Sequence, residues 1–345
     1  MKYKNILVTG GSGFIGSNFI HNILKTENVK IFNIDKLTYA GNNSNHQHLE
    51  NNNNYSFIKG DVTDKRLINN ILKEKSINCV VHFAAESHVD RSIDNPEEFL
   101  NTNIYGTYNL LNCSLEHYKS TKEFVFIHIS TDEVYGTLLD DESPFIETNQ
   151  YLPNSPYSAS KAASDMLVRA WHHTYGLPTI TTNCSNNYGP YQFIEKLIPL
   201  TIYNAINYKP ITIYGDGSNI RDWLYVDDHC DAIKTIINKG SFGEVYNIGG
   251  NNEFKNIDIV NKICEILDYK SPIANKNNSI KLKSYKELIT FIPDRPGHDY
   301  RYSIDSSKII NSLNWKPAYS FNTGIEKTVS WYLENQDWIK SLDKN

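Results

Sequence analysis

Three consecutive polar residues, Thr131-Asp132-Glu133, follow an apolar run that is typical of a buried strand. Downstream, Tyr157 and Lys161 form a Tyr-x-x-x-Lys spacing at the start of a helical pattern. An ammonium group one helical turn away lowers the pKa of a phenol, so this pair can supply the base for hydride transfer. Simple hydride transfer needs no further acid and base. The two adjacent carboxyl groups therefore indicate elimination of water coupled to an internal redox step; the alternative is that they only cap the next element.

A glycine-rich turn, Gly10-x-x-Gly13-x-x-Gly16, lies between the first apolar run and a helical pattern. Glycines let the backbone approach a pyrophosphate closely, and the helix N-terminus that follows supplies unpaired N–H groups. Asp35 ends the second strand, roughly 20 residues further on, where a carboxylate accepts hydrogen bonds from ribose hydroxyls and repels a 2′-phosphate. We therefore expect NAD rather than NADP, with Lys36 as the one feature that argues the other way. A loop cap is the alternative role for Asp35.

The other residues expected around the cofactor follow the ends of the predicted strands or lie on neighbouring elements. Small side chains among them leave room for a ligand. The expected contacts are Phe14, Ile15, Lys36, Leu37, Thr38, Asp61, Val62, Phe83, Ala84, Ala85, Ser87, Thr102, Tyr157, Lys161 and Asn187.

The order of the predicted elements favours an α/β fold with a doubly wound, Rossmann-type parallel sheet. Apolar runs of four to six residues without alternation are typical of strands covered on both faces. Helical patterns separate them, which gives the β-α-β order of such sheets. The predicted strands are 6–8, 29–34, 55–58, 79–83 and 124–130, and the predicted helices are 14–25, 67–72 and 96–118.

After residue 187 the pattern changes, because prolines and glycines punctuate shorter elements. We expect a second, smaller α/β lobe there that binds substrate. The predicted NAD-binding domain spans residues 1–187, with 221–249 returning to it, and the predicted lobe comprises 188–220 and 250–330. The asparagine-rich stretch 42–54 is predicted to be a solvated loop, where a metal site at His46 and His48 is not expected.

Composition excludes several classes of protein. The chain has 345 residues and a formal net charge of −5, without the basic excess of a nucleic-acid binder. It has no apolar run long enough to span a membrane and no predicted signal peptide. The five cysteines are scattered and odd in number, which argues against a disulfide framework or a zinc cluster. We expect a cytoplasmic protein.

Beyond the single motifs, the chain resembles the extended short-chain dehydrogenase/reductases that act on nucleotide sugars, and among them the dTDP-glucose 4,6-dehydratases. The resemblance covers nearly the whole length in the family's order. It is carried by the segments 84–92, 130–136, 155–161, 183–190, 195–199, 221–225 and 294–298, together with the glycine turn.

The resemblance implies conversion of dTDP-glucose to dTDP-4-dehydro-6-deoxyglucose with NAD. Tyr157, beside Lys161, would take the proton of the sugar 4-hydroxyl while hydride leaves C4, with Thr131 bonded to the same oxygen. Glu133 would take the C5 proton, Asp132 would protonate the departing 6-hydroxyl, and hydride would return to C6. Asp132 must then have a raised pKa.

The same resemblance places the substrate and suggests an assembly. It implies a homodimer that pairs through helices 96–118 and 157–175, no metal, and a place in deoxysugar supply such as dTDP-rhamnose. The implied substrate contacts are Ser87, Thr131, Asn186, Glu195, Lys196, Leu197, Thr212, Tyr214, Arg221, Asn256, Arg295 and His298.

Three alternatives remain open at this point. The substrate could be UDP-glucose, since thymine and uracil differ by one methyl group, which discriminates by only about 1–3 kcal/mol. A nucleotide-sugar 4-epimerase would share the glycines, Tyr157 and Lys161, but has no use for Asp132 and Glu133. A non-catalytic NAD-binding sensor would need only the glycines.

Overall fold

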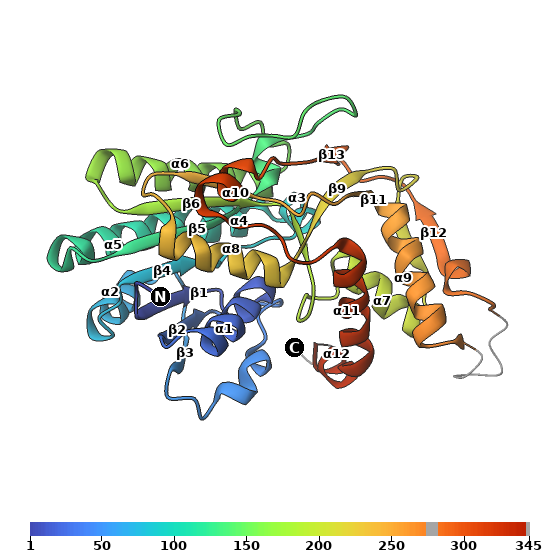
Figure 1. The fold of residues 1–345 in the computed structure, drawn as a ribbon, viewed down its shortest axis with the longest axis horizontal. Helices are drawn as coiled ribbons and strands as arrows, with labels where there is room; N and C mark the ends of the chain where they lie inside the picture. The colour runs from blue at the N-terminus through green and yellow to red at the C-terminus, as the bar shows by residue number, and fades with distance from the viewer. Residues whose placement is uncertain (274–281, 343–345) are drawn as a thin grey trace.

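The computed structural model describes residues 1–273 and 282–342, so residues 274–281 of the predicted lobe lie outside the described residues. A seven-stranded sheet forms the larger part of the molecule (Figure 1). Every strand pair in this sheet is parallel. Its order is β10-β6-β5-β4-β1-β2-β3, with β1 (Asn5–Thr9), β2 (Lys30–Asp35), β3 (Tyr55–Lys59), β4 (Cys79–His82), β5 (Val125–Thr131), β6 (Thr179–Cys184) and β10 (Val245–Ile248).

Helices cover both faces of this sheet, which confirms the predicted doubly wound α/β fold. Successive strand residues point to opposite faces, so Ile6 and Val8 enter one core while Leu7 enters the other. The first core is closed by α1 (Phe14–Thr26), α8 (Val226–Lys239) and α10 (Ser307–Leu313). The second is closed by α2 (Lys65–Glu74), α5 (Thr107–Thr121) and α6 (Pro156–Tyr175).

A smaller group of elements surrounds a separate hydrophobic core beside the sheet, on the right of Figure 1. Its helices are α7 (Leu197–Ile206), α9 (Asn256–Lys270), α11 (Phe321–Glu334) and α12 (Gln336–Leu342). Two small sheets complete it: β8 (Ile211–Tyr214) pairs in parallel with β12 (Ile289–Ile292), and β9 (Ile220–Tyr225) joins β7 (Asn186–Tyr188), β11 (Glu253–Lys255) and β13 (Arg301–Tyr302).

The predicted lobe boundary is wrong for α10. This helix falls in the segment 250–330, yet it packs against β10 and α8 of the large sheet, where Ile309 and Leu313 are buried. Residues 221–225 also differ from expectation, because they form β9 of the small four-stranded sheet rather than returning with α8 and β10. The apolar spacing of a helix does not reveal which of two cores it covers.

The predicted helix 96–118 is interrupted. The chain forms α3 (Val89–Asp94) and α4 (Pro96–Phe99), then a π-helical segment η2 (Leu100–Gly106), before α5 begins. Within η2 the carbonyl of Asn103 accepts hydrogen bonds from the hydroxyls of Thr107 and Ser164, each at 2.6 Å. Side-chain donors that occupy a helical carbonyl widen the backbone ladder at that point.

The prediction that residues 42–54 form a solvated loop is also wrong. Residues Asn43–Leu49 form a 3₁₀ helix, η1, and His46 is only 2% exposed. Its Nε2 donates to the Gly11 carbonyl at 2.8 Å, and Asn45 Oδ1 accepts from Trp338 Nε1 of α12 at 2.7 Å. These partners lie far away in the sequence, so the polar composition of the stretch gave no sign of burial.

Candidate active site

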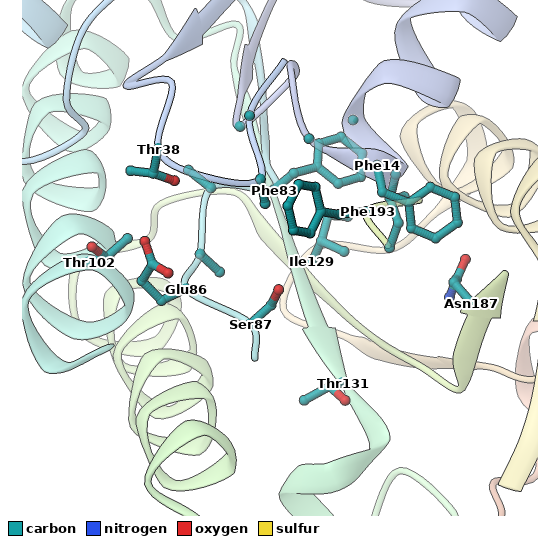
Figure 2. A pocket seen from close by; sticks show the side chains of 18 of the residues that line it. Phe14, Thr38, Phe83, Glu86, Ser87, Thr102, Ile129, Thr131, Asn187 and Phe193 are labelled. Atoms are coloured by element: carbon teal, nitrogen blue, oxygen red, sulfur yellow. The ribbon is translucent and has the colours of Figure 1, made fainter. Parts of the chain in front are cut away.

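One cavity opens at the carboxyl ends of the central strands (Figure 2). It brings together most of the residues expected to hold the cofactor and to carry the chemistry. The predicted residues that line it are Gly10, Gly13, Phe14, Ile15, Gly16, Asp35, Lys36, Thr38, Asp61, Val62, Phe83, Ala84, Ala85, Ser87, Thr102, Thr131, Asp132, Glu133, Tyr157, Lys161, Asn186, Asn187, Glu195 and Lys196.

The backbone of the glycine turn packs so closely against neighbouring backbone that side chains at Gly10 and Gly16 would clash. Gly10 has φ +69°, and a Cβ there would lie 2.6 Å from the Ala84 backbone. A Cβ at Gly16 would lie 2.5 Å from the Gly10 carbonyl oxygen. Helix α1 begins at Phe14 with no side-chain cap, which leaves its first N–H groups and its positive dipole end facing the cavity. These features fit the pyrophosphate of a dinucleotide.

Asp35 is held at the end of β2 with a fixed orientation. Its Oδ2 accepts from Ser12 N at 2.9 Å and its Oδ1 from Leu37 N at 2.8 Å. Burial raises the pKa of Asp35, and these two backbone hydrogen bonds lower it. Lys36 turns to Asp61, with 2.9 Å between Nζ and Oδ2. The Lys36 charge is thus paired, which leaves less support for a 2′-phosphate at this position.

Helix α6 positions Tyr157 and Lys161 at its buried start. Ser155 caps the helix through a capping box with Ser158, and Pro156 occupies the first turn. Both catalytic candidates are buried beneath the cavity, and Lys161 Nζ donates to the Ile129 carbonyl at 2.8 Å. The helix register therefore sets both side chains against the end of β5.

The lowered pKa expected for Tyr157 is not found in the chain alone. Burial, followed by the charge of Glu133, holds the pKa of Tyr157 well above its ordinary value, and the Thr131 hydroxyl lowers it in part. Lys161 gives its hydrogen bond to Ile129 rather than to the phenol. Positive charge near the phenol, from Lys161 and from a cationic cofactor ring when one is bound, would oppose this effect of burial.

The two carboxyl groups after β5 occupy a short 3₁₀ helix, η3 (Asp132–Tyr135), which Thr131 caps by accepting from Glu133 N at 3.3 Å. The Asp132 side chain is 2% exposed, and its Oδ2 has no hydrogen-bond partner within the described residues. Burial, then Glu133, raises the pKa of Asp132 well above its ordinary value, as the acid role requires. Burial also raises the pKa of Glu133, while Lys196 and Arg221 lower it.

The loop before α7 reaches over the cavity from the smaller group of elements. Lys196 Nζ donates to the Ser87 carbonyl at 2.8 Å. Glu195 Oε2 lies 3.5 Å from Arg91 Nε and 3.7 Å from His88 Nε2, both in or beside α3. Polar side chains from both parts of the molecule therefore meet at this cavity.

Several predicted residues do not line this cavity: Leu37, Leu197, Thr212, Tyr214, Arg221, Asn256, Arg295 and His298. Three of them form an outer group, in which Asp90 accepts from Arg295 Nη1 at 2.7 Å and from Tyr214 OH at 3.2 Å, while the Tyr214 and His298 rings meet edge to face. Arg221 lies behind the cavity wall rather than in it. Its guanidinium is buried and donates to backbone carbonyls of residues 220, 299 and 300.

Sequence reasoning missed a further set of cavity residues. Most flank a predicted residue or directly precede a strand end, so adjacency to the motifs was the one available signal. Figure 2 shows Glu86, Ile129 and Phe193 among them. The missed residues are Ile34, Ala40, Gly41, Gly60, Glu86, Ile129, Ser130, Cys184, Ser185, Gln192 and Phe193.

The part of the chain that the structure describes holds neither a metal-binding cluster nor a membrane-spanning helix. Residues 1–273 and 282–342 contain no group of three His, Cys, Asp or Glu side chains arranged to hold a metal ion. None of the helices in the described part of the chain has the length and apolarity needed to cross a bilayer.

Comparisons with known proteins agree on one family. Residues 7–328 match the family model described as GDP-mannose 4,6 dehydratase. The dTDP-glucose 4,6-dehydratase of Xanthomonas campestris pv. campestris (strain B100) is 51% identical over 341 residues, which cover 97% of this chain and 95% of the relative.

Two solved structures of dTDP-glucose 4,6-dehydratases are also similar. The enzyme from Bacillus anthracis str. Ames, in complex with NAD, has a TM-score of 0.85 at 45% identity over 98% of this chain and 99% of its own. The enzyme from Streptomyces venezuelae, with NAD and a nucleotide ligand bound, has a TM-score of 0.88 at 40% identity over the same shares.

Proposed function

Because this chain belongs to the dTDP-glucose 4,6-dehydratases of the GDP-mannose 4,6 dehydratase family, we propose that Thr131, Asp132, Glu133, Tyr157 and Lys161 carry its reaction. The chain is an NAD-dependent hydro-lyase that converts dTDP-glucose to dTDP-4-dehydro-6-deoxyglucose. The observation that supports these roles best is that all five residues line the cavity that the glycine turn also lines. A 4-epimerase would have no chemical use for the adjacent carboxyl groups of Asp132 and Glu133.

NAD+, when bound, accepts a hydride from C4 of the sugar and returns it to C6. The residues present fit this cofactor, because the glycines allow a tight turn before α1, where a Cβ at Gly10 or Gly16 would meet backbone atoms, and Asp35 stands at the end of β2. The residues that would hold it are Phe14, Ile15, Thr38, Val62, Ala84 and Thr102, with the glycines and Asp35.

Tyr157 takes the proton of the sugar 4-hydroxyl in the first step. The Thr131 hydroxyl lowers the pKa of Tyr157 and would bond the same sugar oxygen. The Lys161 ammonium adds a positive charge one turn along α6, which favours the phenolate. Together these groups oppose the burial that otherwise keeps the Tyr157 proton in place.

Glu133 and Asp132 divide the proton transfers of the elimination. A carboxylate is needed to take the C5 proton, and Lys196 and Arg221 both lower the pKa of Glu133 toward that form. A protonated carboxyl is needed to release the 6-hydroxyl as water, and burial keeps Asp132 in that form. Burial raises the pKa of both carboxyl groups, and nearby cations oppose that rise more strongly at Glu133, which assigns the base role to Glu133 and the acid role to Asp132.

Substrate binding draws on two sets of residues. Ser87, Asn186, Glu195 and Lys196 in the cavity would contact the sugar and the diphosphate. Arg295, Tyr214 and His298 in the outer group would contact the nucleotide, since arginine binds phosphate oxygens through charge-assisted hydrogen bonds. Turnover with dTDP-glucose and UDP-glucose in competition tests the choice of base: preferential use of dTDP-glucose is expected.

We also propose a homodimer in the cytoplasm. Large apolar side chains are exposed on η2, α5 and α6: Leu100 and Tyr105 are each 51% exposed, and Tyr108 and Met166 lie on the neighbouring helices. Such a patch is typical of an association surface. All five cysteines are buried free thiols, as a reducing compartment allows. Sedimentation of Tyr105→Lys tests the interface, and a dimer of unchanged stability would exclude this face.

Incubation with dTDP-glucose tests the function itself. The alkali-induced absorbance of the 4-keto product should rise without net accumulation of NADH. Recovery of a galactose nucleotide would instead indicate an epimerase, and no change with any sugar nucleotide would indicate a sensor.

A further inference from the structure

One deeply buried carboxyl group beside the active site has no part in the steps above. Asp165 lies on α6 one helical turn after Lys161 and two turns after Tyr157, so the three side chains share one face of the helix. It is 3% exposed. A carboxyl group buried to this extent is costly unless charged or hydrogen-bonding groups surround it, so its partners indicate what it does.

Asp165 and Lys161 hold the same end of β5 through adjacent contacts. Lys161 Nζ donates to the Ile129 carbonyl at 2.8 Å, and Ser130 Oγ donates to Asp165 Oδ2 at 2.9 Å. Thr131 follows directly and leads into the two catalytic carboxyl groups. One face of α6 therefore fixes both the phenol and ammonium pair and the strand end opposite it.

The surroundings of Lys161 leave Asp165 as its main counter-charge. Burial lowers the pKa of Lys161, whereas Asp165 and then Cys184 raise it. Burial also raises the pKa of the Cys184 thiol, which keeps it neutral. His82 and His128 face Lys161 from β4 and β5, and burial holds the pKa of each well below its ordinary value, so both are neutral.

The charge of Asp165 is itself regulated by its neighbours. Burial raises the pKa of Asp165 to about 7, while Lys161 and the hydroxyls of Ser130 and Tyr151 lower it. His128 Nε2 lies 3.1 Å from Asp165 Oδ1. The charge of Asp165 therefore depends on how far Lys161 and these hydroxyls oppose its burial.

We propose that Asp165 is a positioning residue for the reaction: its carboxylate keeps Lys161 in the ammonium form beside Tyr157 and, through Ser130, fixes the end of β5. This inference rests on the proposed roles of Tyr157 and Lys161. The positive charge of Lys161 favours the phenolate, and loss of the Asp165 charge lets Lys161 lose its proton at a lower pH. The alkaline limit of the first oxidation then moves to lower pH.

Two single variants separate charge from hydrogen bonding. Asp165→Asn removes the charge and keeps an acceptor for Ser130, whereas Ser130→Ala removes the hydrogen bond and keeps the charge. The measurement is the single-turnover rate of bound NADH formation from dTDP-glucose across a pH series. The alkaline limb should move down by about one pH unit or more in Asp165→Asn and stay in place in Ser130→Ala. A limb that stays in place in Asp165→Asn, whatever the rate, would overturn the proposal.

An exchange of the two residues guards against a folding defect. Ser130→Asp with Asp165→Ser returns a carboxylate to the same gap, and Ser130→Asn with Asp165→Ser is its neutral counterpart. Circular dichroism and thermal unfolding establish that each variant folds. The charged exchange should have the wild-type alkaline limb and the neutral one a lowered limb. Coincident limbs in these two variants would reject the role of the charge.

Tyr157→Phe separates failure of this inference from failure of the proposed function. If Tyr157→Phe oxidises the sugar at the wild-type rate, the proposed roles of Tyr157 and Lys161 are wrong. The proposed role of Asp165, which depends on them, then fails as well. If Tyr157→Phe is inactive and the limb of Asp165→Asn is unmoved, only the Asp165 inference fails.

Discussion

The hydroxyl of Tyr39 donates a hydrogen bond to Glu195 Oε1 at 3.2 Å, which ties the loop after β2 to the loop before α7. The Arg91 guanidinium stacks 3.6 Å from the centroid of the Tyr39 ring and reaches the same carboxylate. Thr38 and Glu195 line the cavity from either side of this contact. Residues expected to hold the cofactor and residues expected to hold the sugar are thus connected across the opening.

Removing this contact should speed the loss of bound NAD. Tyr39→Phe deletes one hydrogen bond to a partly buried carboxylate, worth about 1 kcal/mol, so NAD should dissociate about fivefold faster. The NAD that remains after rapid gel filtration measures this. Tyr175→Phe, at the 53%-exposed end of α6, is the matched control and should retain NAD as the wild type does. Equal dissociation rates for both variants would show that the contact does not retain the cofactor.

Alanine substitutions at two glycines separate the effect of a steric clash from the effect of backbone strain. Gly10 and Gly176 both have φ +69°, but a Cβ at Gly10 meets the Ala84 backbone while one at Gly176 has no atom within 4 Å. Gly176→Ala should lower the free energy of unfolding by about 1 kcal/mol and keep NAD bound. Gly10→Ala should lower it further and lose the cofactor. Copurified NAD in Gly10→Ala equal to that of Gly176→Ala would contradict the proposed cradle.

Stability should fall with acid because two histidines are buried in neutral form. Burial lowers the pKa of His21 to about 3 and that of His46 to about 4. Below their unfolded pKa near 6.5 the unfolded chain binds protons that the folded chain does not, so stability is complete above that pH and is lost as pH falls toward 4. The loss is about 1.4 kcal/mol per pH unit for each histidine.

Denaturant unfolding at several pH values between 7 and 5 measures this loss. His46→Gln should show a smaller decrease in unfolding free energy with acid than the wild type. His48→Gln, an exposed position in the same 3₁₀ helix, is the control and should follow the wild type. If His46→Gln and His48→Gln lose stability at the same rate, His46 is not buried in neutral form.

Arg295 should stabilise the bound substrate and the transition state equally, and it should have no part in the chemical step. Arg295→Met removes a guanidinium that pairs with Asp90 here and would meet the diphosphate of the substrate. KM for dTDP-glucose should rise about tenfold, equivalent to about 1.4 kcal/mol, with kcat within about twofold of the wild type. Arg66→Met on the exposed face of α2 should change neither constant. A fall in kcat at unchanged KM would assign Arg295 to the chemical step instead.

Local sequence patterns were sufficient for strands β1 to β5 of the large sheet and for most residues around the cavity, but they did not predict β6. Strands such as β5 are buried along their whole length and therefore appear as uninterrupted apolar runs. The residues after these runs line the cavity because parallel strands end at one edge, so Asp35 and Thr131 could be assigned from position alone. The helical repeat alone was enough to predict that Tyr157 and Lys161 lie on one face of the same helix.

Long-range contacts explain what the sequence did not reveal. The Tyr39 and Glu195 pair joins residues far apart in the chain, and nothing local to either one predicts it. Arg221 was expected at the diphosphate from its residue type, and the structure adds hydrogen bonds from its guanidinium to carbonyls of the segment before β13. His46 is buried by α1 and its neighbours, although its own segment is polar. In each case, the role of the residue depends on a contact with a partner that is distant in the sequence.

The most direct test of the account is the transient behaviour of Asp132→Asn. Asparagine keeps the size of the buried side chain but has no proton to give the departing 6-hydroxyl, so oxidation at C4 should proceed while loss of water is retarded. Rapid mixing of this variant with dTDP-glucose should therefore show bound NADH building up well above the wild-type level, with little 4-keto-6-deoxy product. Full turnover without accumulation of NADH would contradict the central claim that Asp132 is the acid of the elimination.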